Sequence, residues 1–378
     1  MMHRVCHALL GIGMLAVGLP GASAAQERAD TLAPRLTLQG YADAYYAWDT
    51  GRPPLRDRAL TTQAVRHSEF NINLAHVGVM LDGASVRGRL ALQVGTAVQA
   101  NYAGEPTVGT NSGASVSRFI EEAVVGVRLA PGLWADAGIY LSPIGHEGWV
   151  SATNPTYTRS LTAEYTPYYL SGARLNWQAT PAVALQVHLV NGWQKISDDD
   201  EGKAVVIRAD VTTGPAVVSF SGFAGTERAA AGGSSAEGRA FGQLLLRTPL
   251  DRASTLWLSA DLGRQARAGL PASTWGSLTA VAQRRLSPTV AVAVRGERYI
   301  DRSGAVLAVD GAGAALAGFS ANADVQLRGG ALWRMETRWQ RADRAVFPDR
   351  NGTRRTDLLF VTSLALTFEQ LLRGSSTP

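Results

Sequence analysis

The chain of 378 residues holds one cysteine, Cys6, and only two lysines, Lys195 and Lys203. A single thiol cannot build a disulfide framework, which excludes the small disulfide-stapled class of secreted domains. Beyond the N-terminus, no stretch approaches the roughly 20 consecutive apolar residues of a membrane-spanning helix, so a helical membrane protein is excluded. The formal net charge is +5, but the cations are mostly arginines spread singly along the chain, so nucleic-acid binding is not expected.

The N-terminus has the three-part pattern of a secretory signal peptide. A weakly basic start precedes an apolar run at 8–19 and the small-residue triplet ASA at 22–24, which is typical of a cleavage site. We therefore predict a cleaved signal peptide over 1–24 and a polar periplasmic leader over 25–34. Cys6 lies within the signal peptide, so the mature chain is expected to have no thiol.

From residue 35 onwards, apolar and polar side chains alternate in long runs. A side-chain period of two is that of a β-strand with one apolar and one polar face. In the run 87–101, for example, Leu90, Leu92 and Val94 alternate with arginine and glutamine, and the pattern predicts one strand as far as residue 101. Strands of this length exceed the average of about 5 to 6 residues in soluble sheets and suit tilted strands that cross a membrane.

The connections between these runs alternate between short turns, such as 131–132, and long polar loops, such as 103–117. Short periplasmic turns and longer outer loops are the pattern of outer-membrane barrels. We predict an all-β fold: a transmembrane antiparallel up-and-down β-barrel of about 16 strands over 35–368, ending in an aromatic residue and followed by a C-terminal tail over 369–378. A closed barrel leaves no unpaired edge in lipid.

Soluble β-proteins are the alternative to a membrane barrel. A β-propeller or β-helix also gives many strands with turn signals, but its sequence repeat is usually visible and none is found here. Two stacked sandwiches would need a linker, and no change of composition marks one.

Several stretches resemble one known family, the OmpL-like β-barrel outer-membrane porins. They are RHSEFNINLAHVGV (66–79), RGRLALQVGTAVQANYAGEP (87–106), EEAVVGVRL (121–129), LWADAGIYLSPIGHEG (133–148), TRSLTAEYTPYYLSGARLNW (158–177), LVNGWQKI (189–196) and ALWRMETRW (331–339). The resemblance is densest over about 38–196, and the Ala/Gly-rich loops after Phe223 depart from it. It implies an outer-membrane channel of the porin class and supplies no catalytic positions.

The loop 143–166 is the strongest candidate for a functional site. It is the third long connection, and in general porins the third loop folds into the barrel and narrows the pore. Its charged residues, and the arginines that strand parity places on the lumen wall, are the predicted constriction residues: Glu147, Arg159, Glu164, Arg87, Arg89, Arg128 and Arg174. The excess of arginine predicts a weak anion preference. The alternative is a loop outside the barrel and charges that only solvate the interior.

Two other clusters could carry chemistry. Asp198-Asp199-Asp200-Glu201 could bind a divalent cation, but it lacks the spacing of an EF-hand, and a solvated outer loop is the preferred interpretation. The pair His146-Glu147 has no second histidine at metal-ligand spacing, and the chain has no GxSxG motif. We therefore predict no metal site, no cofactor and no enzymatic activity.

Parity and position also assign residues to the outer surface. One continuous alternation along the second strand places Ile72, Leu74 and His76 on the apolar face. Five aromatic residues near strand ends are assigned to the interfacial girdles of a barrel: Trp48, Tyr102, Trp134, Trp193 and Trp257.

Together these features predict a porin of the bacterial outer membrane, with a water-filled channel for passive diffusion of small hydrophilic solutes and ions. The expected partners are outer-membrane lipid and lipopolysaccharide, these solutes and the barrel-assembly machinery, with no nucleic acid; a homo-oligomer is left open. The alternatives are a substrate-selective or export-associated barrel, a barrel enzyme, and a soluble exported β-protein.

Overall fold

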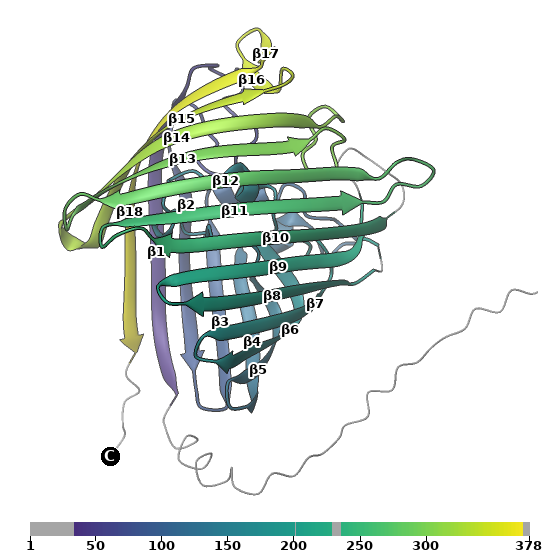
Figure 1. Cartoon of the computed structure of the whole chain (residues 1–378), viewed down its shortest axis with the longest axis vertical. Coiled ribbons are helices and arrows are strands. Elements are labelled where there is room, and N and C mark those ends of the chain that lie inside the picture. Colours follow the sequence, from purple (N-terminus) through teal and green to yellow (C-terminus); the bar gives the residue numbers. More distant parts are fainter. Residues whose placement is uncertain (1–33, 201, 229–235, 373–378) are drawn as a thin grey trace, which may run out of the picture.

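In the computed structural model, which describes residues 34–200, 202–228 and 236–372, the first strand, β1 (Arg35–Asp49), pairs antiparallel with the last, β18 (Thr356–Leu372). This pairing closes a sheet of sixteen antiparallel strands into a barrel (Figure 1). The strands between them follow the chain order: β2 (Phe70–Asp82), β3 (Val86–Val94), β4 (Ile120–Ala130), β5 (Leu133–Leu141), β6 (Tyr169–Thr180), β7 (Val183–Val190), β8 (Ala204–Thr213), β9 (Ala216–Glu227), β10 (Glu237–Pro249), β11 (Ser254–Gln265), β12 (Ser273–Arg285), β13 (Val290–Asp301), β14 (Ala314–Gln326) and β15 (Ala331–Ala342). The predicted all-β barrel is confirmed.

The two ends of the barrel differ in their connections. Short turns, such as 83–85 and 131–132, lie at the end where the described chain begins and finishes, because Leu36 pairs with Leu372 there. The other end carries the long connections, named here L1 (50–69), L2 (95–119), L3 (142–168), L4 (191–203), L7 (302–313) and L8 (343–355), the last containing the hairpin β16 (Phe347–Asp349) and β17 (Gly352–Arg354). The predicted signal peptide lies outside the described residues.

Helices are few and short. The loops hold α2 (Thr96–Asn101), α3 (Ala114–Ser117), α4 (Leu161–Glu164) and the 3₁₀ turn η1 (Ser151–Thr153), and a second 3₁₀ turn, η2 (Arg328–Gly330), lies between β14 and β15. Among the residues that the structure describes, no helix is long and apolar enough to cross a membrane.

The two faces of the wall have opposite chemistry. Outward side chains are apolar and exposed, as at Val125 (71%) and Leu262 (76%), whereas inward positions are often polar and buried, as at Gln243 and Arg295. This alternation, with apolar residues outside, is that of a barrel that faces lipid.

Two local irregularities overturn details of the predicted strands. β3 ends at Val94, because Gly95 adopts φ +137° and α2 then turns inward, so the predicted strand to residue 101 is wrong. In β2 the pairing with β1 shifts by one residue between Asp43 and Ala44, which is a β-bulge at Asn73. Ile72 therefore faces outward, whereas His76 faces the lumen, where its Nδ1 lies 2.9 Å from Glu121 Oε2. The prediction that one continuous alternation places both residues on the same face of the strand is wrong.

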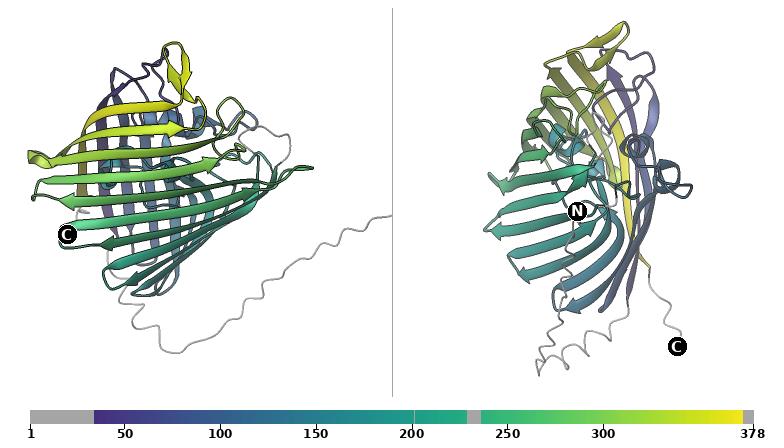
Figure 2. Two further views of the ribbon diagram at one scale, coloured as in Figure 1. Left: turned by 45° about the horizontal axis from the view of Figure 1, so that its top comes forward. Right: turned by 90° about the vertical axis from the view of Figure 1, so that its right-hand side faces the viewer.

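The seam between β1 and β18 is a long pairing, in which the purple first strand and the yellow last strand run side by side in both views of Figure 2. β18 continues to Leu372, four residues beyond Phe368, where the sequence placed the end of the barrel. On the outer face of the seam Phe368 pairs with Gly40, and its ring covers the glycine so closely that an added Cβ would lie 2.1 Å from ring atom Cε1.

We expect Gly40→Val to destabilise the barrel by about 1 kcal/mol, because the new side chain displaces the Phe368 ring from its cross-strand contact. The measurement is the urea midpoint of unfolding in lipid vesicles. Gly296→Val is the control, since Gly296 lies on the outer face of β13 with nothing within 4 Å of an added Cβ. Equal shifts for the two variants would contradict the role given to Phe368.

Candidate channel lumen

L3 crosses the interior of the barrel from the wall of β5 and β6 to the opposite wall. On β1, Tyr41 OH lies 2.8 Å from Ser151 Oγ. On β14, Asn322 Oδ1 accepts a hydrogen bond from the backbone N–H of Tyr157 (3.1 Å). On β15, Arg334 donates to the carbonyl oxygen of Asn154 (2.9 Å). A loop bound to three strands across the barrel lies within the lumen.

The far wall meets L3 through a charged network that we name the L3 cradle, made of Arg295, Glu297, Arg334, Glu336 and Arg338. Arg338 Nη2 lies 2.7 Å from Glu297 Oε1, and Arg295 Nη2 lies 3.1 Å from Glu336 Oε1, with all four side chains fully buried. The same carboxylates accept backbone N–H groups of L3, from Leu161 to Glu297 and from Thr158 to Glu336, each at 2.6 Å.

Charge-assisted hydrogen bonds of this kind are roughly twice as strong as neutral ones, and they fix geometry. L3 is therefore held against β13 and β15 by the wall, rather than resting there through apolar contact.

The two acids of the loop bind backbone N–H groups of L3 and L1. Glu147 accepts the backbone N–H of Ser160 (3.1 Å) and lies 3.8 Å from Arg295 Nη1. Glu164 accepts from the backbone N–H of Thr62 in L1 (3.0 Å), and burial raises the pKa of this carboxyl. Both acids therefore satisfy backbone donors that have no partner in a strand.

Arg159 is fully buried within L3. Its guanidinium lies 3.4 Å from the ring centroid of Tyr168 and 5.2 Å from that of Trp149, and it donates to the carbonyl oxygen of Gly148 (2.8 Å). Burial lowers the pKa of Arg159 to about 9, so the side chain stays charged at neutral pH. Its contacts join the two sides of the loop, since the carbonyl oxygen of residue 148 meets the guanidinium of residue 159.

The predicted wall arginines gather on the lumen face of β3 to β6. Arg87 and Arg174 both pair with Asp136, at 2.7 and 2.9 Å. Arg89 pairs with Glu122 at 2.7 Å. The arginines keep 31%, 20% and 26% of their side-chain surface exposed, whereas Asp136 keeps 1% and Glu122 keeps 9%. Arg89 and Glu122 form a neutral pair, whereas Arg87 and Arg174 share the single carboxylate of Asp136 and together carry a net charge of +1. In each group the cation is the part that meets the lumen.

The fourth predicted arginine, Arg128, donates to the carbonyl oxygen of Ala84 beside a short turn (3.3 Å). The structure thus brings three of the four wall arginines together around wall carboxylates. It does not bring them to Glu147 or Glu164, whose partners lie in L1, in L3 and on β13.

A cavity of about 480 Å³, named here the L3 cavity, remains between L3 and the wall formed by β8 to β11. Its lining includes His146 of L3 and, on the wall, Arg208, Asp210, Leu245, Arg247 and Trp257. Sequence reasoning did not single out the wall residues. Strand parity could have found them, because Leu245 and Arg247 alternate with outward-facing Leu244 and Leu246.

Four of the five aromatic residues assigned to the girdles need correction. Trp48 does lie on the outer face, against Phe360, with ring centroids 5.8 Å apart. Tyr102 is buried in L2, and Trp193 of L4 packs against Phe223 of β9. Trp134 and Trp257 face the lumen. Nearness to a strand end does not set the face; parity does. The exposed aromatics on outward-facing strand positions include Phe70, Trp177, Phe220, Phe319, Trp333, Trp339, Phe360 and Phe368.

The acidic run of L4 is paired with the two lysines of the chain, and Asp199 also lies 3.6 Å from Arg228. Lys195 Nζ lies 2.6 Å from Asp199, 3.2 Å from Asp200 and 2.9 Å from Glu227. Lys203 pairs with Asp198. Within the ranges that the structure describes, which omit Glu201, no group of three or more acidic, histidine or cysteine side chains could hold a metal ion.

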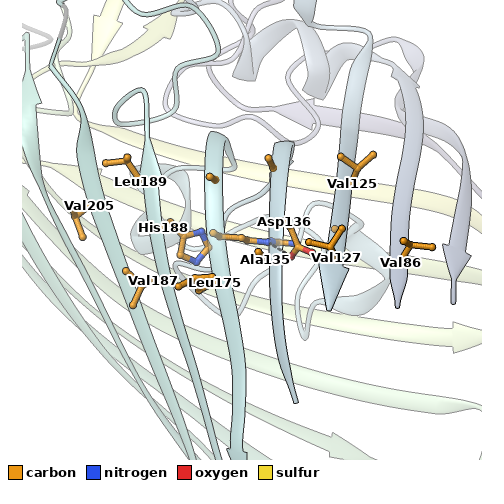
Figure 3. A pocket seen from close by; sticks show the side chains of 14 residues that line it. Val86, Val125, Val127, Ala135, Asp136, Leu175, Val187, His188, Leu189 and Val205 are labelled. Carbon is orange, nitrogen blue, oxygen red and sulfur yellow. Dashed lines mark hydrogen bonds and ion pairs between the residues drawn. The ribbon is translucent and has the colours of Figure 1, made fainter. Parts of the chain in front are cut away.

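A second hollow, of about 640 Å³, lies on the outside of the wall (Figure 3). It forms where Ala135 and its small neighbours on β5 and β6 are flanked by bulky residues such as Val125 and Leu189, which are 71% and 56% exposed. His188, also drawn in Figure 3, is buried on the lumen side. This hollow is apolar and faces lipid, so it is no path for a hydrophilic solute.

The barrel is similar to several solved outer-membrane proteins. The anion-selective porin from Comamonas acidovorans has 12% identity and a TM-score of 0.59, covering 89% of this chain and 100% of that chain. OmpT of Vibrio cholerae has 8% identity and a TM-score of 0.59, covering 89% and 99%. The outer-membrane channel DcaP of Acinetobacter baumannii has 12% identity and a TM-score of 0.53, covering 89% and 97%. At such identities the likeness shows the fold alone.

No curated protein matches the chain in sequence. The family described as "Putative beta-barrel porin-2, OmpL-like" matches residues 35–368, which is nearly the whole barrel. Fold and family agree with the non-enzymatic channel expected from the sequence, and this chain belongs to the OmpL-like family of outer-membrane β-barrel porins.

Proposed function

We propose that this chain forms a water-filled channel that passes small hydrophilic solutes and ions by diffusion, with L3 as its constriction. The observation that carries the proposal is the attachment of L3 to β1, β14 and β15 across the lumen. A loop fixed there leaves solutes the space beside it, which includes the L3 cavity along β8 to β11. Family membership supports the channel, and the hydrogen bonds of L3 support the constriction.

The preference that we propose is for anions. Arg87, Arg89 and Arg174 expose their guanidinium groups to the lumen while Asp136 and Glu122 are buried behind them. Charged side chains that meet a solute in a narrow, partly dehydrated pore select by sign. The name of the Comamonas acidovorans relative, an anion-selective porin, is in keeping with this direction.

In planar bilayers, the purified full-length protein should give stepwise conductance in KCl. In a KCl gradient, its reversal potential should have the sign expected when chloride is more permeant than potassium. Heat-denatured protein is the control and should give no steps. A reversal potential favouring potassium would contradict the anion preference. If the protein has the heat-modifiable gel mobility of a folded barrel but gives no conductance steps, the proposed channel is contradicted.

The partners expected from the sequence remain proposals. The apolar outer face fits outer-membrane lipid, with lipopolysaccharide around it, and the seam of β1 and β18 is where the barrel-assembly machinery would complete closure. One similar solved structure is described as a trimer form of Vibrio cholerae OmpT, which keeps a homo-oligomer among these proposals.

A further inference from the structure

The L3 cavity contains one cation without a partner. Arg247 is exposed, and among the described residues it forms no hydrogen bond or ion pair. It lies on the lumen face of β10, three residues before the short turn that follows Pro249. An unpaired guanidinium in a partly enclosed space is an attractive site for an anion.

The second arginine of the cavity, Arg208, already has hydrogen-bond and ion-pair partners within the protein. Its Nη2 lies 2.8 Å from Asp210 Oδ1 and 3.1 Å from Ser219 Oγ, and its Nη1 donates to the carbonyl oxygen of Gly145 in L3 (3.2 Å). This side chain neutralises Asp210 and ties L3 to β8. The cavity therefore carries the net positive charge of Arg247, since burial lowers the pKa of His146 and keeps its imidazole neutral at pH 7.

Apolar surface lies directly beside this cation. Arg247 pairs across the sheet with Val217 on β9 and with Trp257 on β11, so its position on the wall has an aliphatic residue on one side and an indole on the other. Leu245 adds a further apolar wall. On the opposite side, His146 Nε2 is buried with no hydrogen-bond partner among the described residues. The lining thus offers a cation, a flat aromatic face and one free imidazole nitrogen.

We propose that the L3 cavity binds a small organic anion in which a carboxylate is attached to a flat apolar ring. The carboxylate lies on Arg247, whose planar guanidinium matches it in two parallel hydrogen bonds, and the ring packs on Trp257 and Leu245. A volume of about 480 Å³ falls within the range of small-molecule pockets, about 300 to 1,000 Å³. The inference rests on the proposed channel, because the lumen is the route by which the solute arrives.

The test is block of the KCl current by benzoate in planar bilayers, with acetate and benzamide as partial analogues. Benzoate should block at a concentration at least about tenfold lower than either analogue, because acetate lacks the ring and benzamide lacks the charge. Arg247→Gln should raise the half-blocking concentration of benzoate at least about tenfold, and Trp257→Leu should weaken the block by benzoate but not by acetate.

Arg328→Gln is the matched control. It removes the same charge from η2, in a turn outside the L3 cavity, and should leave benzoate block as in the wild type. Equal effects of the two arginine substitutions would show that only the general charge of the lumen matters and would overturn the site, as would equal block by benzamide.

Calorimetric titration of benzoate into the detergent-folded barrel separates this inference from the channel itself. Heat of binding that is present in the wild type and in Arg328→Gln, but lost in Arg247→Gln, supports the site even if no current flows. If the wild type binds benzoate but carries no current, the channel is refuted and the binding site is not. Conduction without any saturable binding of benzoate refutes the site alone.

Discussion

Removal of the L3 tip, residues 149–158, should raise single-channel conductance several-fold. The tip crosses the lumen and is bonded to β1, β14 and β15, so its deletion opens the space that it fills. A short Gly-Ser linker can rejoin the chain, because Arg159 donates to the carbonyl oxygen of Gly148 at 2.8 Å and the two cut ends are already neighbours. Conductance in KCl and the swelling rate of liposomes in sugar solutions measure the effect.

The sign of ion selectivity should survive this deletion. In the uncovered wall, Arg295, Arg334 and Arg338 keep partners in Glu336, Asp324 and Glu297, so these pairs add no net charge. Asp43 loses its hydrogen bond from Ser151 (3.0 Å) and adds at most one negative charge, while the exposed arginines of β3 and β6 are unchanged. A control deletion of 107–112, a mostly exposed part of L2, should leave conductance as in the wild type. Unchanged conductance after loss of the L3 tip, in a barrel that still folds, would place the narrowest point elsewhere.

Glu297→Gln should destabilise the protein by about 3–5 kcal/mol, because it leaves buried arginine charge without its partner. Glu297 Oε1 lies 2.7 Å from Arg338 Nη2 and 3.6 Å from Arg295 Nε, and all three side chains are fully buried. The same carboxylate receives the N–H of Leu161 at the start of α4, so L3 also loses part of its attachment. The urea midpoint in lipid vesicles reports the stability, and open-channel current noise reports the motion of L3.

Two further variants give this prediction its controls. Asp251→Asn breaks an exposed pair with Arg284, whose side chains are 52% and 56% exposed, and should produce no measurable change. Adding Arg338→Met to Glu297→Gln should restore part of the stability, because it removes one uncompensated charge. If Asp251→Asn and Glu297→Gln were equally harmful, burial of the L3 cradle would not be the cause.

The barrel itself was predictable because its signal repeats along the chain. Alternation and the contrast of short and long connections are each seen many times, so single irregularities do not obscure them. The bulge at Asn73 and the turn at Gly95 were not predictable, since each depends on a local pairing or dihedral angle that the period of two does not carry. The face of the strand on which His76 lies was predicted wrongly for the same reason.

The candidate site was predictable only as a loop. The position of L3 follows from counting connections, but its partners do not, because Thr158 and Glu336 are 178 residues apart and meet only when the barrel closes. The roles of Glu147 and Glu164 were not predictable from the sequence for a different reason. Loops enclosed in the lumen need acceptors for backbone N–H groups that have no strand partner. Glu147 accepts such a group in L3 and Glu164 accepts one in L1, and neither reaches the arginines of β3 to β6.

The order in which the chain is made bears on how it can fold. L3 is complete long before β13 to β15, which hold the L3 cradle, and the seam joins residues as far apart as Gln39 and Glu369, separated by 330 positions. Contacts of such long range make folding slow, because loop-closure entropy is lost before they form. L3 can dock fully only when β13 to β15 are in place beside it, so docking of the loop and closure of the barrel are coupled late events. A nascent chain without its last third has an undocked L3 and two open sheet edges.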